Sequence, residues 1–181
     1  MRFILLNILM LTPLFFANAQ EEIDNSDEIV SYLSASQYEL GAQMGSLIPA
    51  GISGVRDNYP LIATWFSHPT HYGDIEYNFS AAQAKGVTWQ EGDLTLRVSF
   101  NIYDFFSGYF SLGGHGVRYQ KVDASDFQTS FGSHFGFGNY IQLAGPYWSR
   151  VDFKFGFGPG NTLAITAGLI YRWGSEGSDS Q

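Results

Sequence analysis

The feature that most constrains this chain is a two-residue alternation of apolar and polar side chains, repeated in segments of about ten residues between turn-forming residues. Residues 150–158 give the cleanest example, with Val151, Phe153, Phe155 and Phe157 at every second position. Successive side chains of a β-strand point to opposite faces, so these four share one face and the polar residues between them share the other. The alternation predicts a sheet with one apolar and one polar face.

Eight such segments follow one another along the chain. They cover residues 37–48, 59–67, 72–83, 93–103, 108–119, 133–144, 150–158 and 162–173. The connection Pro159-Gly160-Asn161 between the last two is typical of a hairpin. An even number of antiparallel strands brings both ends of the chain to the same side. The sequence therefore predicts an all-β fold, an eight-stranded antiparallel up-and-down barrel.

The predicted connections differ in length. Those after the first, third and fifth segments are long, at 49–58, 84–92 and 120–132, whereas those at 68–71, 104–107 and 145–148 are short. Membrane barrels have short turns at one end and longer loops at the external end. The long connections offer residues for contact with an extracellular partner, namely Arg56, Asp57, Trp89, Glu91, Asp123 and Asp126.

The composition bears on which face of the barrel points outward. Charged residues make up 14% and aromatic residues 17% of the chain, whereas soluble domains carry roughly 25% charged residues. The polar face is mainly Gly, Ser, Thr, Asn and Gln with a few opposite charges, which suits a narrow interior. We expect the apolar face to contact lipid, as in a transmembrane barrel; a soluble, lipocalin-like barrel with reversed faces is the alternative.

The first residues predict export. A basic start at Arg2, an apolar run from Phe3 to Phe16 and the small-residue site Ala17-Asn18-Ala19 are typical of a secretory signal peptide. We predict a signal peptide at 1–19, an acidic N-terminal arm at 20–36, the barrel at 37–173 and a polar tail at 174–181. The expected location is the bacterial outer membrane.

Two groups of residues are predicted inside and around such a barrel. The first is an interior charge network of Glu39, Asp74, Glu76, Arg97, Arg150, Asp152, Lys154 and Arg172, in which closure brings Arg172 near Glu39. Because buried charges must be paired, this network predicts a plug and not an open pore. The second is an aromatic girdle at the periplasmic end, made by Trp65, Tyr72, Tyr103, Phe105, Tyr147, Trp148, Tyr171 and Trp173.

The sequence predicts no catalytic, cofactor or metal site. Cysteine is absent and no basic stripe exists, so a thiolate metal site and a nucleic-acid partner are excluded. His68 and His71 lie in a short polar turn without organised carboxylates. His115 and His134 are expected to point inward and to serve packing and hydrogen bonding. Ser133 adjoins His134 but points to the opposite face, and Ser111 is four residues from His115, so neither pair forms a dyad.

From the signal peptide, the strand count, the loop asymmetry, the girdle and the closing run Leu169-Ile170-Tyr171-Arg172-Trp173, the chain resembles the small outer-membrane barrels of the OmpA/OmpX/OmpW kind over roughly residues 37–173. These barrels usually end on an aromatic residue, whereas here residues 174–181 follow Trp173. The resemblance implies a non-catalytic envelope protein with a plugged interior and a structural or surface-contact role.

Two alternatives stay open. One is a carrier or small channel for apolar molecules, OmpW-like or lipocalin-like, whose lumen would be lined by Ile62 and Phe66. The other is a lipid-modifying hydrolase. None of the four histidines has the serine two positions later that the lipid A deacylase family carries. The sequence makes no prediction of oligomeric state.

Overall fold

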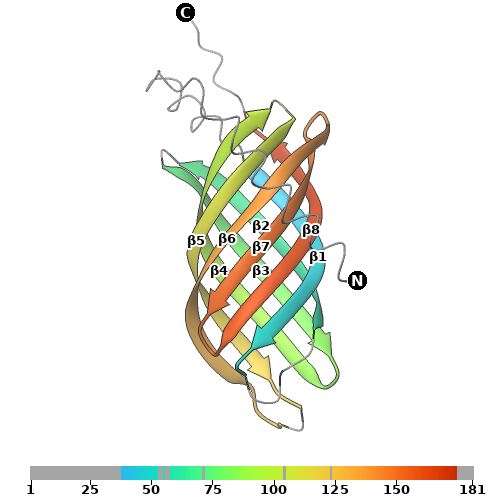
Figure 1. Cartoon of the computed structure of the whole chain (residues 1–181), viewed down its shortest axis with the longest axis vertical. Coiled ribbons are helices and arrows are strands. Elements are labelled where there is room, and N and C mark those ends of the chain that lie inside the picture. The colour runs from blue at the N-terminus through green and yellow to red at the C-terminus, as the bar shows by residue number, and fades with distance from the viewer. Residues whose placement is uncertain are drawn as a thin grey trace, which may run out of the picture. The chain divides into compact units, whose positions relative to one another are not determined.

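The computed structural model describes residues 38–52, 55, 58–70, 72–103, 105–122 and 124–174. These residues form eight β-strands (Figure 1). The strands are β1 (Tyr38–Ala50), β2 (Tyr59–Thr70), β3 (Gly73–Ala84), β4 (Val87–Tyr103), β5 (Phe106–Gln120), β6 (Gln128–Ala144), β7 (Tyr147–Phe157) and β8 (Asn161–Trp173). The predicted signal peptide, the predicted acidic arm and all of the predicted tail except Gly174 lie outside the described residues.

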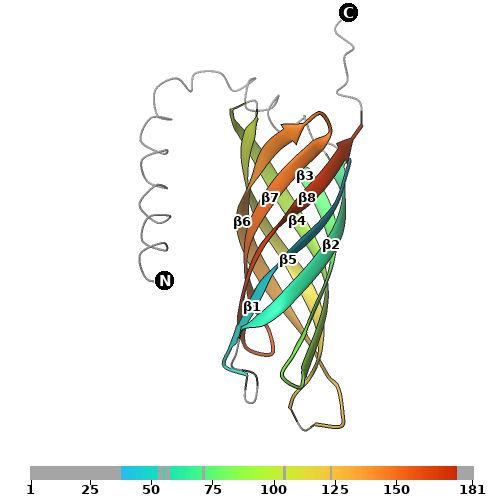
Figure 2. The same cartoon turned by 90° about the vertical axis from the view of Figure 1, so that its right-hand side faces the viewer.

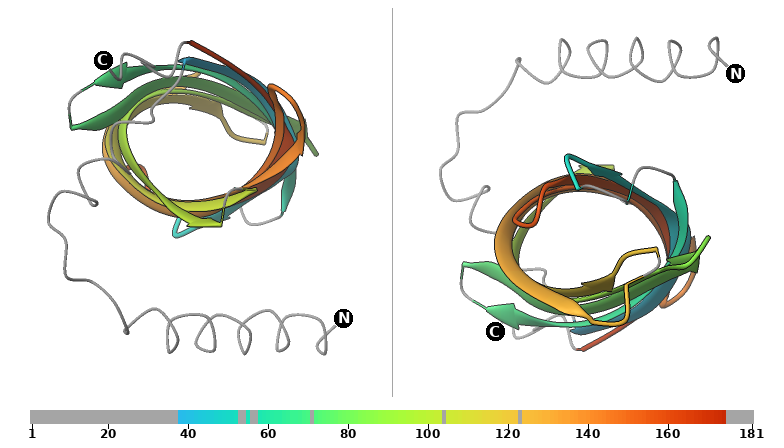
Figure 3. Two further views of the ribbon diagram at one scale, coloured as in Figure 1. Left: turned by 90° about the horizontal axis from the view of Figure 1, so that it is seen from above. Right: turned by 90° about the horizontal axis from the view of Figure 1, so that it is seen from below.

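Every strand pairs antiparallel with its neighbour in sequence, and the sheet closes because β1 also pairs with β8. The closing ladder is continuous, from Tyr38 opposite Trp173 to Ala50 opposite Asn161. Figure 3 shows the ring of strands from both ends. The predicted eight-stranded antiparallel barrel is confirmed.

The two ends of the barrel differ in their connections. The start of β1, the end of β8 and the short turns after β2, β4 and β6 lie at one end, which we call the terminal end. The connections after β1, β3, β5 and β7 lie at the other end, which we call the loop end and which is at the bottom of Figures 1 and 2. Among the connections between the eight described strands, the two longest are at the loop end, at residues 51–58 and 121–127.

The predicted long connection at 84–92 is wrong. Strand β4 begins at Val87, and only Lys85 and Gly86 join it to β3. Both turn residues have positive φ, 52° and 77°, as a tight two-residue hairpin turn requires. Trp89 and Glu91, predicted as loop residues, are inside the barrel and 1% and 6% exposed. Near the loop end, the inward side chains of β4 are apolar, as with Val87 and Trp89. The apolar positions therefore switch from the outer to the inner face along this strand, and the sequence shows no single regular alternation.

The distribution of side chains is inverted relative to that of a soluble protein. Charged and polar residues fill the interior, including Arg97, Glu76 and His134, at 0%, 3% and 1% exposed. Large apolar side chains cover the outer wall, for example Met44 and Phe131, which are 72% and 81% exposed. Soluble proteins rarely expose contiguous apolar surface of this extent. Within the described chain, no helix is long and apolar enough to cross a membrane.

Candidate functional site

The barrel interior is the candidate site, and its terminal half is organised around Arg97. This guanidinium lies 2.8 Å from a carboxylate oxygen of Glu39, 2.8 Å from Asp74 and 2.9 Å from Glu76. All four side chains are at least 95% buried. They come from β1, β3 and β4, whose inward positions are brought together by closure of the sheet. Each of these buried charges therefore has an opposite charge in contact.

Two further arginines extend this network. Arg150 of β7 lies 2.7 Å from Glu76 and 2.7 Å from Asp152, and its Nε donates a hydrogen bond to the Tyr109 hydroxyl at 3.0 Å. Arg172 of β8 donates to Glu39 at 2.8 Å, so the carboxylate of the first strand pairs with the guanidinium of the last. The network therefore joins both sides of the seam where the barrel closes.

Aromatic rings fill the space between these charges. Arg150 lies 4.5 Å from the ring centre of Trp65 and 4.9 Å from that of Tyr109. Arg172 lies 4.2 Å from the Tyr140 ring. A cation–π contact between a guanidinium and a ring contributes about 2 kcal/mol or more when both groups are desolvated. We call this part of the interior the arginine–aromatic layer.

A second layer lies nearer the loop end and is built around Lys154. Its ammonium group donates to Glu91 and to Asp93, both at 2.7 Å. The imidazole rings of His115 and His134 stack beside it, with centres 5.6 Å apart and planes inclined by 8°. His134 Nε2 is 2.8 Å from the Thr95 hydroxyl, and His115 Nδ1 is 4.0 Å from Glu91. We call this the lysine–histidine layer.

Glycine makes room for the stacked imidazoles. A Cβ placed at Gly113 would lie 2.8 Å from the His134 ring, and one at Gly132 would lie 2.5 Å from His115 Nε2. The rings therefore occupy space that any other residue would fill with its side chain. Within the described residues, no group of three or more His, Asp or Glu side chains has the arrangement of a metal site.

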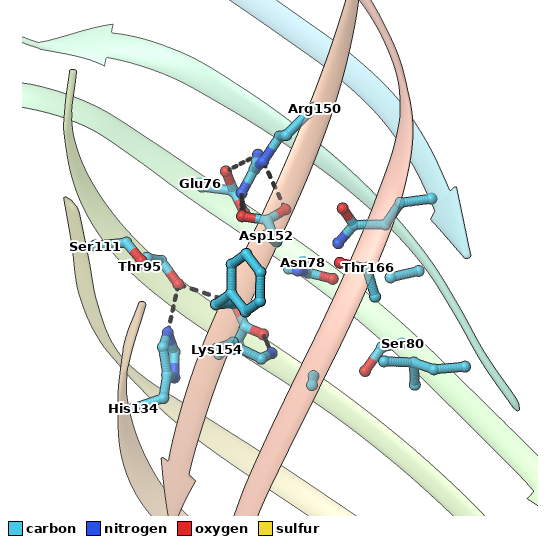
Figure 4. A pocket seen from close by; sticks show the side chains of 16 residues that line it. Glu76, Asn78, Ser80, Thr95, Ser111, His134, Arg150, Asp152, Lys154 and Thr166 are labelled. Carbon is cyan, nitrogen blue, oxygen red and sulfur yellow. Dashed lines mark hydrogen bonds and ion pairs between the residues drawn. The ribbon is translucent and has the colours of Figure 1, made fainter. Parts of the chain in front are cut away.

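A small cavity lies between the two layers (Figure 4). It is lined by Glu76, Asn78, Ser80, Thr95, Ser111, His134, Arg150, Asp152, Lys154 and Thr166, among others. Its volume is about 30 Å³, whereas a single water requires about 10–15 Å³ on this measure. The cavity therefore has room for about two or three water molecules, and it is far smaller than a pocket for an organic ligand.

The loop end of the interior is apolar. Tyr59, Leu61, Trp89 and Val117 are each at most 3% exposed and pack in one cluster. Ile52 and Val55 of the β1–β2 connection turn into this cluster and are 4% and 1% exposed. The mouth cluster, as we call it, fills the loop end with side chains.

Comparison with proteins of known structure shows which proteins share this fold. No family model and no curated protein matches the sequence. The chain is similar in structure to neisserial surface protein A, with a TM-score of 0.62, 10% identity and coverage of 76% of this chain and 96% of that one. The N-terminal barrel of Pseudomonas aeruginosa OprF (0.58, 10%, 75% and 97%) and the Yersinia pestis attachment invasion locus protein Ail (0.54, 11%, 76% and 97%) are also similar. The fold is that of the small outer-membrane barrels.

The structure places the eight predicted interior residues together. Glu39, Asp74, Glu76, Arg97, Arg150, Asp152 and Arg172 lie in or next to the arginine–aromatic layer, and Lys154 lies in the lysine–histidine layer. Each makes at least one ion pair. The sequence analysis did not assign Glu91, Asp93, Tyr109 or Tyr140 to the interior set. Tyr109 and Tyr140 are in frame with the polar residues of β5 and β6, and that frame is the signal that could have found them.

The girdle prediction is wrong for two residues, Trp65 and Trp148. Trp65 is 1% exposed and points into the barrel, and the Trp148 ring packs under Arg172 at 4.3 Å. The remaining predicted residues lie on the outside of the terminal end, namely Tyr72, Tyr103, Phe105, Tyr147, Tyr171 and Trp173, which are 37–78% exposed. Several stack on one another, as Tyr171 does on Trp173 at 5.6 Å.

The predicted apolar lumen lining is also wrong. Ile62 and Phe66 are 65% and 38% exposed and face outward. Strand β2 is apolar on both faces, because Leu61 and Trp65 are buried inside, so its alternation did not define which face was which. With these residues outside, the apolar-carrier alternative loses the lining on which it depended.

Proposed function

We propose that this chain is an integral outer-membrane protein with a closed interior, which serves the envelope or surface contacts and not catalysis. The observation that carries the proposal is the inverted side-chain distribution, with ion pairs inside and large apolar residues outside. Water would not stabilise that outer wall, whereas the hydrocarbon of a bilayer would. In this proposal, residues 1–19 direct export and are removed, and the loop end faces the exterior.

The closed interior is supported by its three successive fillings. The arginine–aromatic layer, the lysine–histidine layer and the mouth cluster lie in series, and the cavity between the first two holds about 30 Å³. Eight strands leave an interior only wide enough for side chains to fill. A water-filled path through the barrel would have to cross all three layers.

A surface-contact role is supported by the loop end. The β5–β6 connection projects beyond the other connections in Figure 2, and Val122 and Phe127 near its ends are 45% and 39% exposed. One structure with a similar fold is that of Ail in complex with the heparin analogue sucrose octasulfate, at a TM-score of 0.51 and 11% identity. That ligand belongs to Ail, and here it suggests only that barrels of this shape can hold an extracellular partner.

The test combines fractionation, heat-modifiable gel mobility and single-channel recording on the full chain expressed in a Gram-negative host. We expect recovery in the outer-membrane fraction, a mature N-terminus at Gln20, a mobility shift on heating and no stepwise conductance. A soluble periplasmic product would overturn the membrane assignment. Stepwise currents from the unmodified protein would overturn the closed interior while leaving the membrane assignment intact.

A further inference from the structure

The outer wall carries a groove that crosses the strands. It has a volume of about 1050 Å³, and its lining comes from seven strands, from β8 and β1 through β6. Outward side chains and the backbone between them, at inward residues such as Ala63 and Val117, form this lining. Its floor is formed by the small residues Ala42, Thr64, Ala81, Gly92, Gly116 and Ala167. The large exposed side chains of Met44, Ile62 and Phe79 stand beside this path, with Phe79 between Thr64 and Gly92 in the register. Large side chains border its terminal side in one continuous row, Leu40, Phe66, Tyr77 and Leu94, each the register partner of the next.

The groove ends in a polar site at the loop end. Arg118 of β5 points outward, and its register partners Gln90 of β4 and Thr129 of β6 flank it on the same face. All three side chains are exposed. The guanidinium lies 4.1 Å from the Phe127 ring centre, which fixes its position. No described carboxylate forms an ion pair with Arg118, whereas Arg97, Arg150, Lys154 and Arg172 are all paired inside the barrel.

The direction of the groove fits one membrane leaflet. From Arg118 on β5 to Leu169 on β8 it crosses five strand spacings, which is roughly 24 Å at the usual distance between strands. Strands of such barrels are tilted by about 40°, so a line across them descends roughly 15 Å along the barrel axis. Half of the hydrocarbon core of a bilayer is also about 15 Å. An occupant with its polar end at Arg118 would reach the bilayer midplane near Ala167 and Leu169.

We propose that this groove binds one lipid of the outer leaflet, with a phosphate headgroup on Arg118, Gln90 and Thr129 and an acyl chain along the small-residue floor. The inference rests on the membrane location proposed above. Charge complementarity selects the headgroup, because an arginine fork binds a phosphate oxygen pair well and an outward arginine is tolerated only at interface depth. The floor selects a flexible apolar chain, because its surface is mostly apolar and the path bends around Met44, Ile62 and Phe79.

The test measures lipid binding to the purified full chain in a zwitterionic detergent by native mass spectrometry. The probes are dipalmitoyl phosphatidic acid and dipalmitoyl phosphatidylcholine, which share the same chains, and inorganic phosphate as competitor. We expect one phosphatidic acid per protein, bound on the order of tenfold more tightly than the choline lipid, since one charge-assisted contact contributes about 1.4 kcal/mol or more. Millimolar inorganic phosphate should not displace it.

Four variants separate the groove from the rest of the surface. Arg118→Gln should lower phosphatidic acid affinity about tenfold, while Lys121→Gln, a nearby loop charge outside the groove lining, should change it less. Ala81→Phe fills the floor and should weaken both lipids, whereas Ser133→Phe, on the outer wall of β6 outside the groove, should not.

Equal binding of the two lipids, or equal effects within each pair of variants, would overturn the groove. Heat-modifiable mobility is measured on every sample. A protein that inserts into membranes and shifts on heating but binds no lipid selectively contradicts this inference alone. One that never enters the membrane fraction contradicts the proposed function.

Discussion

At the residue scale, stability depends on complete pairing of the buried charges. Arg97 contacts three carboxylates while its side chain is fully buried. Removing one partner of a buried ion pair is costly because the other partner stays desolvated and unpaired. The interior network is therefore more sensitive to single substitutions than to its complete replacement.

Arg97→Met should lower the free energy of unfolding by about 3–5 kcal/mol, since Glu39, Asp74 and Glu76 would lose their shared cation. Urea unfolding in lipid vesicles, followed by tryptophan fluorescence, measures this change. Lys121→Met at the loop end is the matched control and should change stability by less than about 0.5 kcal/mol. Equal midpoints for the two variants would mean that the network adds nothing to stability.

The close packing of the barrel wall should require a glycine at Gly138, because no side chain fits there. A Cβ there would collide with the Tyr109 hydroxyl and the Val151 carbonyl oxygen, while one at Gly114 would meet nothing closer than 3.7 Å. Gly138→Ala should cost about 1–3 kcal/mol through overpacking, and Gly114→Ala should have little effect. The same unfolding assay compares the two. If Gly138→Ala were as stable as the wild type, the wall would be adjusting more easily than its backbone contacts suggest.

Residue-level prediction from sequence succeeded where the alternation was clean and failed where it was not. The charged residues of β3, β4, β7 and β8 were assigned inward because apolar partners alternated with them throughout. Trp65 was misplaced because β2 is apolar on both faces. The pairing of His115 with His134 depends on the register of β5 against β6, and a single sequence does not reveal register.

At the element scale, the tight β3–β4 turn has an unusual residue. Lys85 has a φ of 52°, in the left-handed region where a residue with a Cβ is strained, and Gly86 follows at 77°. Asn adopts that region more readily than Lys, and Asn-Gly is the preferred pair for this turn type.

Lys85→Asn should therefore stabilise the barrel by about 0.5 kcal/mol, and Gly86→Val should destabilise it by about 1 kcal/mol or more. Midpoints of urea unfolding give both changes. A destabilised Lys85→Asn protein would show that contacts of the lysine side chain outweigh its backbone strain.

The element boundaries also show what sequence could not supply. Strands β4 and β6 begin six and five residues earlier than the alternation predicted, at Val87 and Gln128. Near the loop end the inner face is apolar, with Val87 and Trp89 buried. A sequence pattern that assumes polar inward residues therefore does not detect the part of a strand whose inward residues are apolar.

At the scale of the whole molecule, the proposed closed interior depends on three layers in series. Trp65 belongs to the layer at the terminal half and Trp89 to the mouth cluster, and each is 1% exposed. Opening one layer leaves the others in place. We expect Trp65→Ala and Trp89→Ala, tested singly in planar bilayers, to show no stepwise conductance although each loses about 3–5 kcal/mol of stability. Steps from Trp89→Ala alone would mean that the mouth cluster is the sole barrier.

The seam between β1 and β8 has a consequence for assembly. The first and last strands of the barrel share an uninterrupted ladder, and Arg172 and Glu39 pair across it. Until β8 is delivered, both edges of the sheet expose rows of unpaired backbone groups, which are templates for pairing with other chains. Such long-range closure forms slowly. The incomplete barrel is therefore prone to aggregation and must be shielded until β8 pairs with β1. The ion pair between Arg172 and Glu39 forms only at that last step.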